Sequence, residues 1–102
     1  MKPYRFLAEA QSEFEEQIRY FDEQVTGLGD RFIQALEDAV LLIRQHPMAG
    51  ETVSKNVRKA LLRAFPFSVY YVNARDEIII VAVAAHRRRP QYWRGRTGDL
   101  QS

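Results

Sequence analysis

Apolar positions in the first half of the chain repeat every three to four residues, as they do on one face of a helix. The first such stripe consists of Phe14, Ile18, Phe21 and Val25. It predicts a helix from about Ala8 to Val25. Ser12 and Glu15 match a helix-capping motif, so a start at Ser12 is an alternative.

A second helix is predicted after the Thr-Gly-Leu-Gly break at residues 26–29, and it extends to about Gln45. Its apolar stripe consists of Leu28, Phe32, Leu36, Ala39 and Ile43. Pro47 ends it, because a residue that precedes proline is disfavoured in the helical region. With so short a break, the two helices are expected to form an antiparallel hairpin. Their apolar stripes need a sheet to cover them.

The second half of the chain changes to strand patterns. Strands are predicted over residues 57–64, 67–72 and 77–85, after a loop over 47–56, and residues 3–7 predict a short first strand. The last strand is apolar on both faces, so we expect neighbouring strands on both sides and helices over it. The predicted class is α+β in the order β-α-α-β-β-β, with a helical hairpin packed on a small, mainly antiparallel sheet. Residues 1–96 are expected to form one domain, and residues 97–102 a polar tail.

Composition excludes several kinds of site. There is no cysteine, and His46 and His86 lack the spacing of zinc ligands, so we expect no metal and no cofactor. The longest apolar run has eight residues, against the roughly 20 that a membrane helix needs. The N-terminus lacks the apolar core of a signal peptide. We therefore expect a cytoplasmic protein without a membrane partner.

The net charge of +2 hides a strong asymmetry. Residues 1–53 contain five Lys or Arg and ten Asp or Glu, a balance of −5, whereas residues 54–102 contain ten and three, a balance of +7. If the second half forms one surface, that surface is basic. Its expected partners are anionic: nucleic acid or an acidic protein segment.

Two segments carry a resemblance to a known family. They are Phe-Pro-Phe-Ser-Val-Tyr-Tyr at 65–71 and His-Arg-Arg-Arg-Pro-Gln-Tyr-Trp at 86–93, and Ile-Arg-Gln-His-Pro-Met-Ala-Gly at 43–50 also fits. A strand entered through Phe-Pro, followed by an apolar strand that ends in His and Arg, resembles the RelE/ParE toxin superfamily. The resemblance extends over roughly residues 3 to 96.

This resemblance implies a toxin of a bacterial type II toxin–antitoxin system. ParE-like members inhibit DNA gyrase, and RelE-like members are mRNA endonucleases that act on the ribosome. Both are neutralised by a small cognate antitoxin, ParD-like in the first case. The resemblance therefore implies an antitoxin partner and either gyrase or the ribosome with mRNA as the target.

The residues favour the ParE-like branch, which implies no catalytic residue. Cleavage of RNA through its own 2′-hydroxyl needs a base, cations around the phosphate and an acid. A RelE-like set would consist of Lys59, Arg63, Arg88 and Tyr92. That set lacks the arginine expected on the third strand, whose place falls at Phe67 or Ser68.

The residues expected to bind the target or the antitoxin are mostly basic. They are Lys55, Arg58, Lys59, Arg63, His86, Arg87, Arg88, Arg89, Tyr92 and Trp93. Several have a competing structural interpretation: Trp93 as a core residue, His86 as a strand-end residue bonded to the backbone, and one arginine of 87–89 as the partner of an internal acid. A plain nucleic-acid-binding domain is a weaker alternative. The acidic side chains of the first helix are expected to be solvated. They are Glu9, Glu13, Glu16, Asp22 and Glu23.

Overall fold

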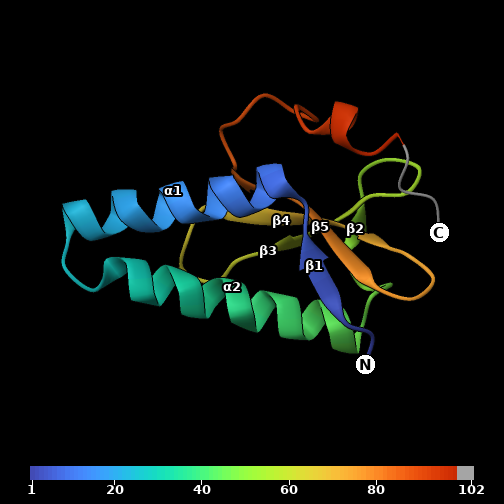
Figure 1. Ribbon diagram of the computed structural model, residues 1–102, viewed down its shortest axis with the longest axis horizontal. Helices are drawn as coiled ribbons and strands as arrows, with labels where there is room; N and C mark the ends of the chain where they lie inside the picture. The colour runs from blue at the N-terminus through green and yellow to red at the C-terminus, as the bar shows by residue number, and fades with distance from the viewer. Residues whose placement is uncertain (99–102) are drawn as a thin grey trace.

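The computed structural model describes residues 1–98, and it shows the α+β class predicted from the sequence (Figure 1). The elements are β1 (Tyr4–Phe6), α1 (Ala8–Gln24), α2 (Leu28–Gln45), β2 (Glu51–Thr52), β3 (Arg58–Leu61), β4 (Phe67–Asn73), β5 (Ile78–Ala85) and a 3₁₀ turn, η1 (Arg94–Arg96). The predicted tail over 97–102 lies outside the described residues from 99 onward. In the described part of the chain, no helix is long and apolar enough to cross a membrane.

The five strands form one sheet in the order β1-β5-β4-β3-β2. β1 lies parallel to β5, and the other neighbours are antiparallel. β5 therefore has a strand on each side, as its two apolar faces predicted. The prediction missed β2, which lies inside the expected 47–56 loop and pairs with the start of β3. A two-residue strand leaves no periodic pattern to detect.

The strand predicted over 57–64 is shorter than expected. β3 ends at Leu61, and the Leu62 amide then bonds the Phe67 carbonyl oxygen at 3.0 Å across the Phe65–Pro66 corner. Ala64 has a φ of 68°, which takes it out of the strand conformation. The strand therefore ends three residues earlier than its apolar pattern suggests.

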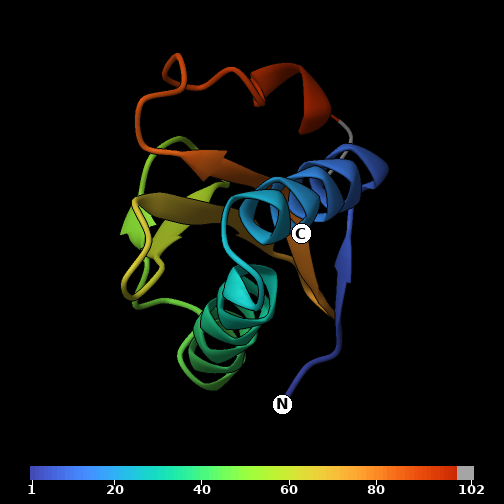
Figure 2. The same cartoon turned by 90° about the vertical axis from the view of Figure 1, so that its left-hand side faces the viewer.

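The two helices form the predicted antiparallel hairpin, seen end-on in Figure 2. Gly27 turns the chain with a φ of 87°, which glycine tolerates, and the Asp22 carboxylate accepts a 2.8 Å bond from the Gly29 amide. The alternative start at Ser12 is wrong, because α1 begins at Ala8. The Leu7 amide still bonds the Ile80 carbonyl oxygen at 2.9 Å, so β1 leads directly into the helix.

The main core lies between the hairpin and one face of the sheet. Phe32, Leu36 and Ile43 of α2 are buried there, as predicted, and Phe14 and Phe21 of α1 pack against them half-buried. Rings from the helices meet rings from the Phe-Pro-Phe corner, with Phe32 and Phe67 centroids 5.1 Å apart. Burial of apolar surface is the dominant favourable contribution to folding, and aromatic rings bury large areas each.

A second, smaller core covers the opposite face of the sheet. Its members are Val57, Val72, Ala74, Ile79, Val81, Ala82 and Trp93. Trp93 is 1% exposed, and its ring centroid lies 5.2 Å from that of Tyr70. This confirms the core interpretation of Trp93. The residues after β5 therefore close the face of the sheet that the helices leave open. In both views this red C-terminal segment lies on the side away from α2 (Figures 1 and 2).

Candidate functional site

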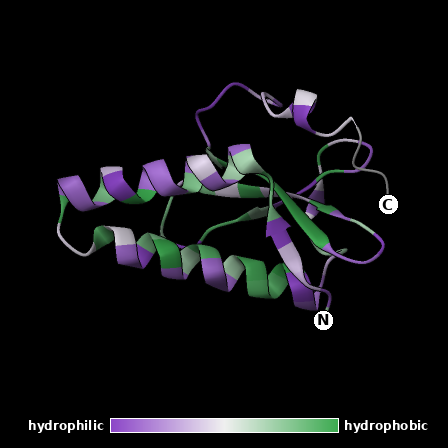
Figure 3. Cartoon of the chain, viewed as in Figure 1, coloured by the Kyte–Doolittle hydropathy of each residue, from purple (hydrophilic) through white to green (hydrophobic). Residues whose placement is uncertain are grey.

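The arginines at 87–89 lie on an exposed loop that leaves the end of β5. Figure 3 shows the contrast between the apolar strand β5 and the hydrophilic chain that follows it. The loop begins at His86, whose backbone amide bonds the Pro66 carbonyl oxygen at 2.9 Å. His86 thus lies at the strand end, but the interpretation that its side chain caps the backbone is wrong, because the side chain is exposed and forms no hydrogen bond within residues 1–98.

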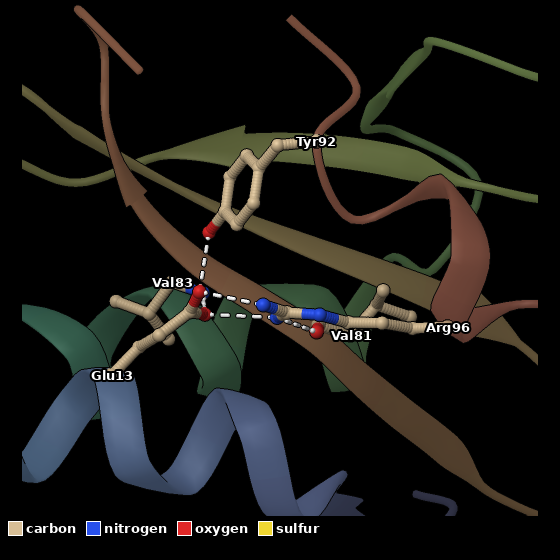
Figure 4. Close-up of polar contacts among 5 residues, drawn as sticks. All are labelled: Glu13, Val81, Val83, Tyr92 and Arg96. Carbon is tan, nitrogen blue, oxygen red and sulfur yellow. Dashed lines mark hydrogen bonds and ion pairs between the residues drawn. The ribbon is translucent and has the colours of Figure 1, made fainter. Parts of the chain in front are cut away.

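Behind this loop, polar side chains of the C-terminal segment donate hydrogen bonds to the carboxylate of Glu13 on α1 (Figure 4). Its Oε2 accepts bonds from the Tyr92 hydroxyl at 2.7 Å and from Arg96 Nη2 at 2.9 Å. Its Oε1 accepts bonds from Arg96 Nη1 and from the Val83 amide, both at 3.1 Å. The Glu13 and Arg96 side chains are each 17% exposed, so this ion pair is better shielded from water than a surface pair.

The geometry of β5 explains why a carboxylate belongs here. β1 ends at Phe6 opposite Ile80, so the rest of β5 has no strand partner on that side within the described residues. Glu13 accepts from the Val83 amide, and Arg96 Nη1 donates to the Val81 carbonyl oxygen at 3.0 Å. The two side chains thus replace backbone pairing at a strand edge, where unpaired polar groups are costly when buried.

Tyr92 is held as a neutral hydrogen-bond donor. Burial, with the hydrogen bond to Glu13 and the negative charge of Glu13, raises the pKa of its hydroxyl well above the usual value. The guanidinium carbon of Arg88 lies 3.8 Å from the centre of the Tyr92 ring, a cation–π contact. The hydrogen bond and ion pair with Glu13 raise the pKa of Arg96. Arg96 therefore remains charged at all physiological pH values.

Two predictions about charge are wrong here. Glu13 was expected on the solvated face of the first helix, yet it makes four hydrogen bonds and is mostly buried. An arginine of 87–89 was expected to pair with an internal acid, yet the ion pair is made by Arg96. In the described part of the chain, no ion pair involves residues 87–89. In the structure Glu13 lies one helical turn from the buried Ala10, but its sequence position did not distinguish it from the other acids of α1.

The basic residues of β3 support the neighbouring loop. Arg58 Nη1 donates to the carbonyl oxygens of Met48 at 3.0 Å and Gly50 at 2.8 Å. Lys59 Nζ lies 3.6 Å from Glu51 Oε1 across the β2–β3 pair. Lys55 is exposed in the loop before β3. Arg58 is thus occupied in structure, whereas the Lys55 side chain forms no hydrogen bond or ion pair with any of residues 1–98.

The structure does not bring the RelE-like set together. Arg88 and Tyr92 are in contact, but Lys59 lines a pocket beside the end of α2 and Arg63 a different one beside its first half. Arg88 lines a third pocket, next to α1. Cleavage needs these groups around one phosphate. Among residues 1–98, no three side chains are grouped to bind a metal ion either.

An apolar groove of about 380 Å³ lies between α1 and the Phe65–Pro66 corner. Phe21, Phe67 and the half-exposed Tyr20 line it, and His86 and Arg87 lie at its margin. From the sequence, Phe21 was expected in the apolar stripe of the first helix and Phe67 in the Phe-Pro-Phe segment, and no prediction was made about Tyr20. An apolar pocket next to the cationic guanidinium of Arg87 fits a protein segment with a bulky apolar side chain and a nearby carboxylate.

Comparison with known proteins gives a family and a fold. Residues 4–90 match the family model described as the ParE toxin of type II toxin-antitoxin system, parDE. A chain of the solved structure titled "Chromosomal ParDE TA system from P. aeruginosa" superposes with a TM-score of 0.62. The identity is 15%, over 83% of this chain and 96% of that chain, so this likeness concerns the fold. The comparison with curated proteins gives no match.

Proposed function

The chain belongs to the ParE toxin family of type II toxin–antitoxin systems, and from this we propose that it inhibits DNA gyrase and is neutralised by a cognate antitoxin. In this proposal the toxin acts by binding, as a single domain over residues 1–96. Because gyrase works on the chromosome, the proposal places the toxin in the cytoplasm.

The main support for a toxin that acts by binding is that the Tyr92 hydroxyl is already engaged in a hydrogen bond inside the fold. In a nuclease of the RelE-like kind, this tyrosine would have to exchange a proton near the scissile phosphate. Here its hydroxyl donates to Glu13 at 2.7 Å, and its pKa is raised far from neutrality. Lys59 and Arg63 line pockets that Tyr92 does not share. These facts favour a toxin that binds its target over one that cleaves RNA.

The apolar groove beside Phe65 supports the antitoxin part of the proposal. An antitoxin segment would place a bulky apolar side chain against Tyr20, Phe21 and Phe67 and a carboxylate beside Arg87. A second contact is the outer edge of β3. β2 pairs only with Arg58 and Lys59, so the rest of that edge is free for an added strand within the described residues.

The decisive experiment is a supercoiling assay with purified gyrase, relaxed plasmid and the toxin freed from its antitoxin. We expect loss of supercoiling or accumulation of cleaved plasmid, and full recovery when the antitoxin is added back. Absence of any effect at a large excess of folded toxin contradicts gyrase as the target. In that case, cleavage of mRNA on translating ribosomes tests the RelE-like function directly.

A further variant tests the groove. Tyr20 is 52% exposed at the groove, so Tyr20→Ala removes contact area with little cost in folding. We expect antitoxin affinity to fall at least tenfold by titration calorimetry, as for an aromatic hot spot. Tyr4→Ala is the control, because Tyr4 is 40% exposed and does not line the groove. Equal losses from both variants contradict the groove assignment.

A further inference from the structure

We propose that the C-terminal arginines bind the phosphate backbone of the DNA that gyrase holds, so that the toxin contacts enzyme and DNA together. This inference rests on the proposed function, because it names a second partner of the same toxin. The element concerned is the arginine segment, which we define as residues 86–96. It contains five arginines and no acidic residue.

Four of the five arginines of this segment are exposed and form no ion pair within residues 1–98, whereas Arg96 is paired with Glu13. Arg87, Arg88, Arg89 and Arg94 are all exposed. The ion pairs within residues 1–98 join Arg5 to Glu77, Lys59 to Glu51 and Arg96 to Glu13, so none of the four takes part. Both Glu13 oxygens already accept bonds from Arg96, and one accepts from Tyr92. Glu16 borders the same pocket as Arg87 and Arg88 without forming an ion pair.

The backbone of the segment is anchored, and two of its exposed cations, Arg88 and Arg94, are held by side-chain contacts, so these two need little ordering on binding. Arg88 lies against the Tyr92 ring at 3.8 Å, and Tyr92 is fixed by Glu13. The Gln91 side chain donates to the Val53 carbonyl oxygen at 3.1 Å and accepts a bond from Arg94. Trp93 anchors the whole segment in the second core. Preorganised cations lose less side-chain entropy when a ligand arrives.

The composition of this surface favours a phosphate backbone over a protein surface. Protein interfaces have an apolar centre from which charges are depleted, whereas interfaces with DNA are polar and strongly positive. Among residues 86–98, no large hydrophobic side chain is exposed; the exposed ones belong to other elements. The apolar groove lies beside Phe65 and shares Arg87 with this segment, but not Arg88, Arg89 or Arg94. Those three arginines are therefore separable from the antitoxin site.

The test uses the triple variant Arg88→Ala/Arg89→Ala/Arg94→Ala. Its matched control is Arg19→Ala/Arg31→Ala/Arg75→Ala, which removes the same charge from exposed positions on α1, α2 and the β4–β5 turn. Binding to a fluorescent 20-base-pair duplex is measured by anisotropy between 50 and 300 mM KCl. Non-specific affinities of this kind lie at roughly 10⁻⁴ to 10⁻⁶ M. Thermal unfolding and antitoxin affinity, both expected to change little, show that each variant is folded.

We expect the arginine variant to bind DNA at least tenfold more weakly than the control. The slope of log K against log salt should decrease by about 0.9 for each phosphate that the variant no longer neutralises. The concentration that half-inhibits supercoiling should rise at least tenfold for the arginine variant only. The single variant Arg89→Glu, which adds repulsion, should weaken DNA binding more than Arg89→Ala.

Three outcomes overturn the inference. The first is a wild-type toxin that inhibits gyrase but has no measurable affinity for DNA. The second is equal behaviour of the two triple variants. The third is a loss of gyrase inhibition in the arginine variant with DNA binding unchanged, which would place an acidic protein surface against these arginines. If the wild type does not inhibit gyrase at all, the proposed function fails, and the DNA measurement still decides this inference by itself.

Discussion

The hydroxyl of Tyr92 donates a 2.7 Å hydrogen bond to Glu13, although 79 residues separate them in sequence. This contact joins the segment after the last strand to the first helix. Arg96 binds the same carboxylate at 2.9 Å. Because both partners come from the C-terminal segment, Glu13 fixes that segment to α1, in addition to the anchor that Trp93 provides in the second core.

Replacing Glu13 should destabilise the protein more than replacing any exposed acid of the same helix. Glu13→Gln removes the charge that pairs with Arg96, and the new amide group cannot accept every bond that the carboxylate accepts. We expect the free energy of unfolding to fall by about 1–3 kcal/mol, the usual range when a buried charged partner is left unsatisfied. Urea denaturation is the measurement. Glu23→Gln, at an exposed position of α1, is the control and should change it by less than about 0.5 kcal/mol.

The stability of the protein should fall steeply in alkaline solution, partly because of Tyr92. Burial and Glu13 raise the pKa of its hydroxyl in the folded state, so the unfolded state ionises first, near pH 10. Below pH 10 the hydroxyl is protonated in both states, so its contribution to the free energy of unfolding is fully present. Above pH 10, the folded state holds a proton that the unfolded state has released, and stability falls by up to about 1.4 kcal/mol per pH unit.

Tyr92→Phe isolates this contribution. The variant should lose about 1 kcal/mol at pH 8, from the missing hydrogen bond. Between pH 10 and 11.5 its stability should fall less steeply than that of the wild type. Burial raises the pKa of Tyr71 too, so the difference between the two proteins is the quantity to compare. Identical slopes for wild type and variant would show that Tyr92 is not protected in the folded state.

The same variant separates the two branches of the superfamily. Tyr92→Phe keeps the ring under Arg88 and removes only the hydroxyl. If the toxin acts by binding, its inhibition of gyrase should stay within about threefold of the wild type at a temperature where both are folded. Loss of a hundredfold or more, the size of a general acid–base contribution, would instead indicate proton transfer by this tyrosine.

Gly50 should not tolerate a side chain. A Cβ atom there would collide with the Tyr71 hydroxyl and lie 3.0 Å from the Lys59 carbonyl oxygen. Tyr71 is buried and its hydroxyl is bonded to the Pro47 carbonyl oxygen, so it has little room to move. Gly50→Ala should cost about 1–3 kcal/mol by urea denaturation, as overpacking usually does. Gly95→Ala is the control, since a Cβ atom at Gly95 meets nothing within 4 Å.

The single tryptophan gives a direct readout of the second core. Trp93 is 1% exposed, so its fluorescence should be blue-shifted in the native protein and shift to the red on unfolding. Trp93→Ala should cost about 3–5 kcal/mol. Trp93→Phe, which keeps a ring against Tyr70, should cost clearly less. Similar losses of stability in both variants would contradict this, because they would show that the indole stabilises the protein by something other than filling the core.

The sequence predicted the local elements well because they depend on periodicity. The helical stripes marked both helices, and the unbroken apolar run predicted that β5 has neighbours on both sides. Trp93 was expected among the binding residues with a core position as the competing interpretation, which rested on its bulk rather than on periodicity, and the structure places it in the core. Apolar spacing reports which face of an element is buried, and that information is local.

The polar contacts could not be predicted in this way, because periodicity does not indicate which residues from distant segments come into contact. Glu13 looked like any other acid on the outer face of α1, and Arg96 like one of five arginines in the C-terminal segment. Their pairing depends on where β1 ends beside β5, which leaves the Val83 amide and the Val81 carbonyl oxygen to be satisfied by side chains. The helices, most of the strands and the basic character of the second half thus follow from local pattern and composition. Which charges are paired inside the fold, and which stay exposed, depends on the distances between segments far apart in the chain, and these are set by the three-dimensional packing.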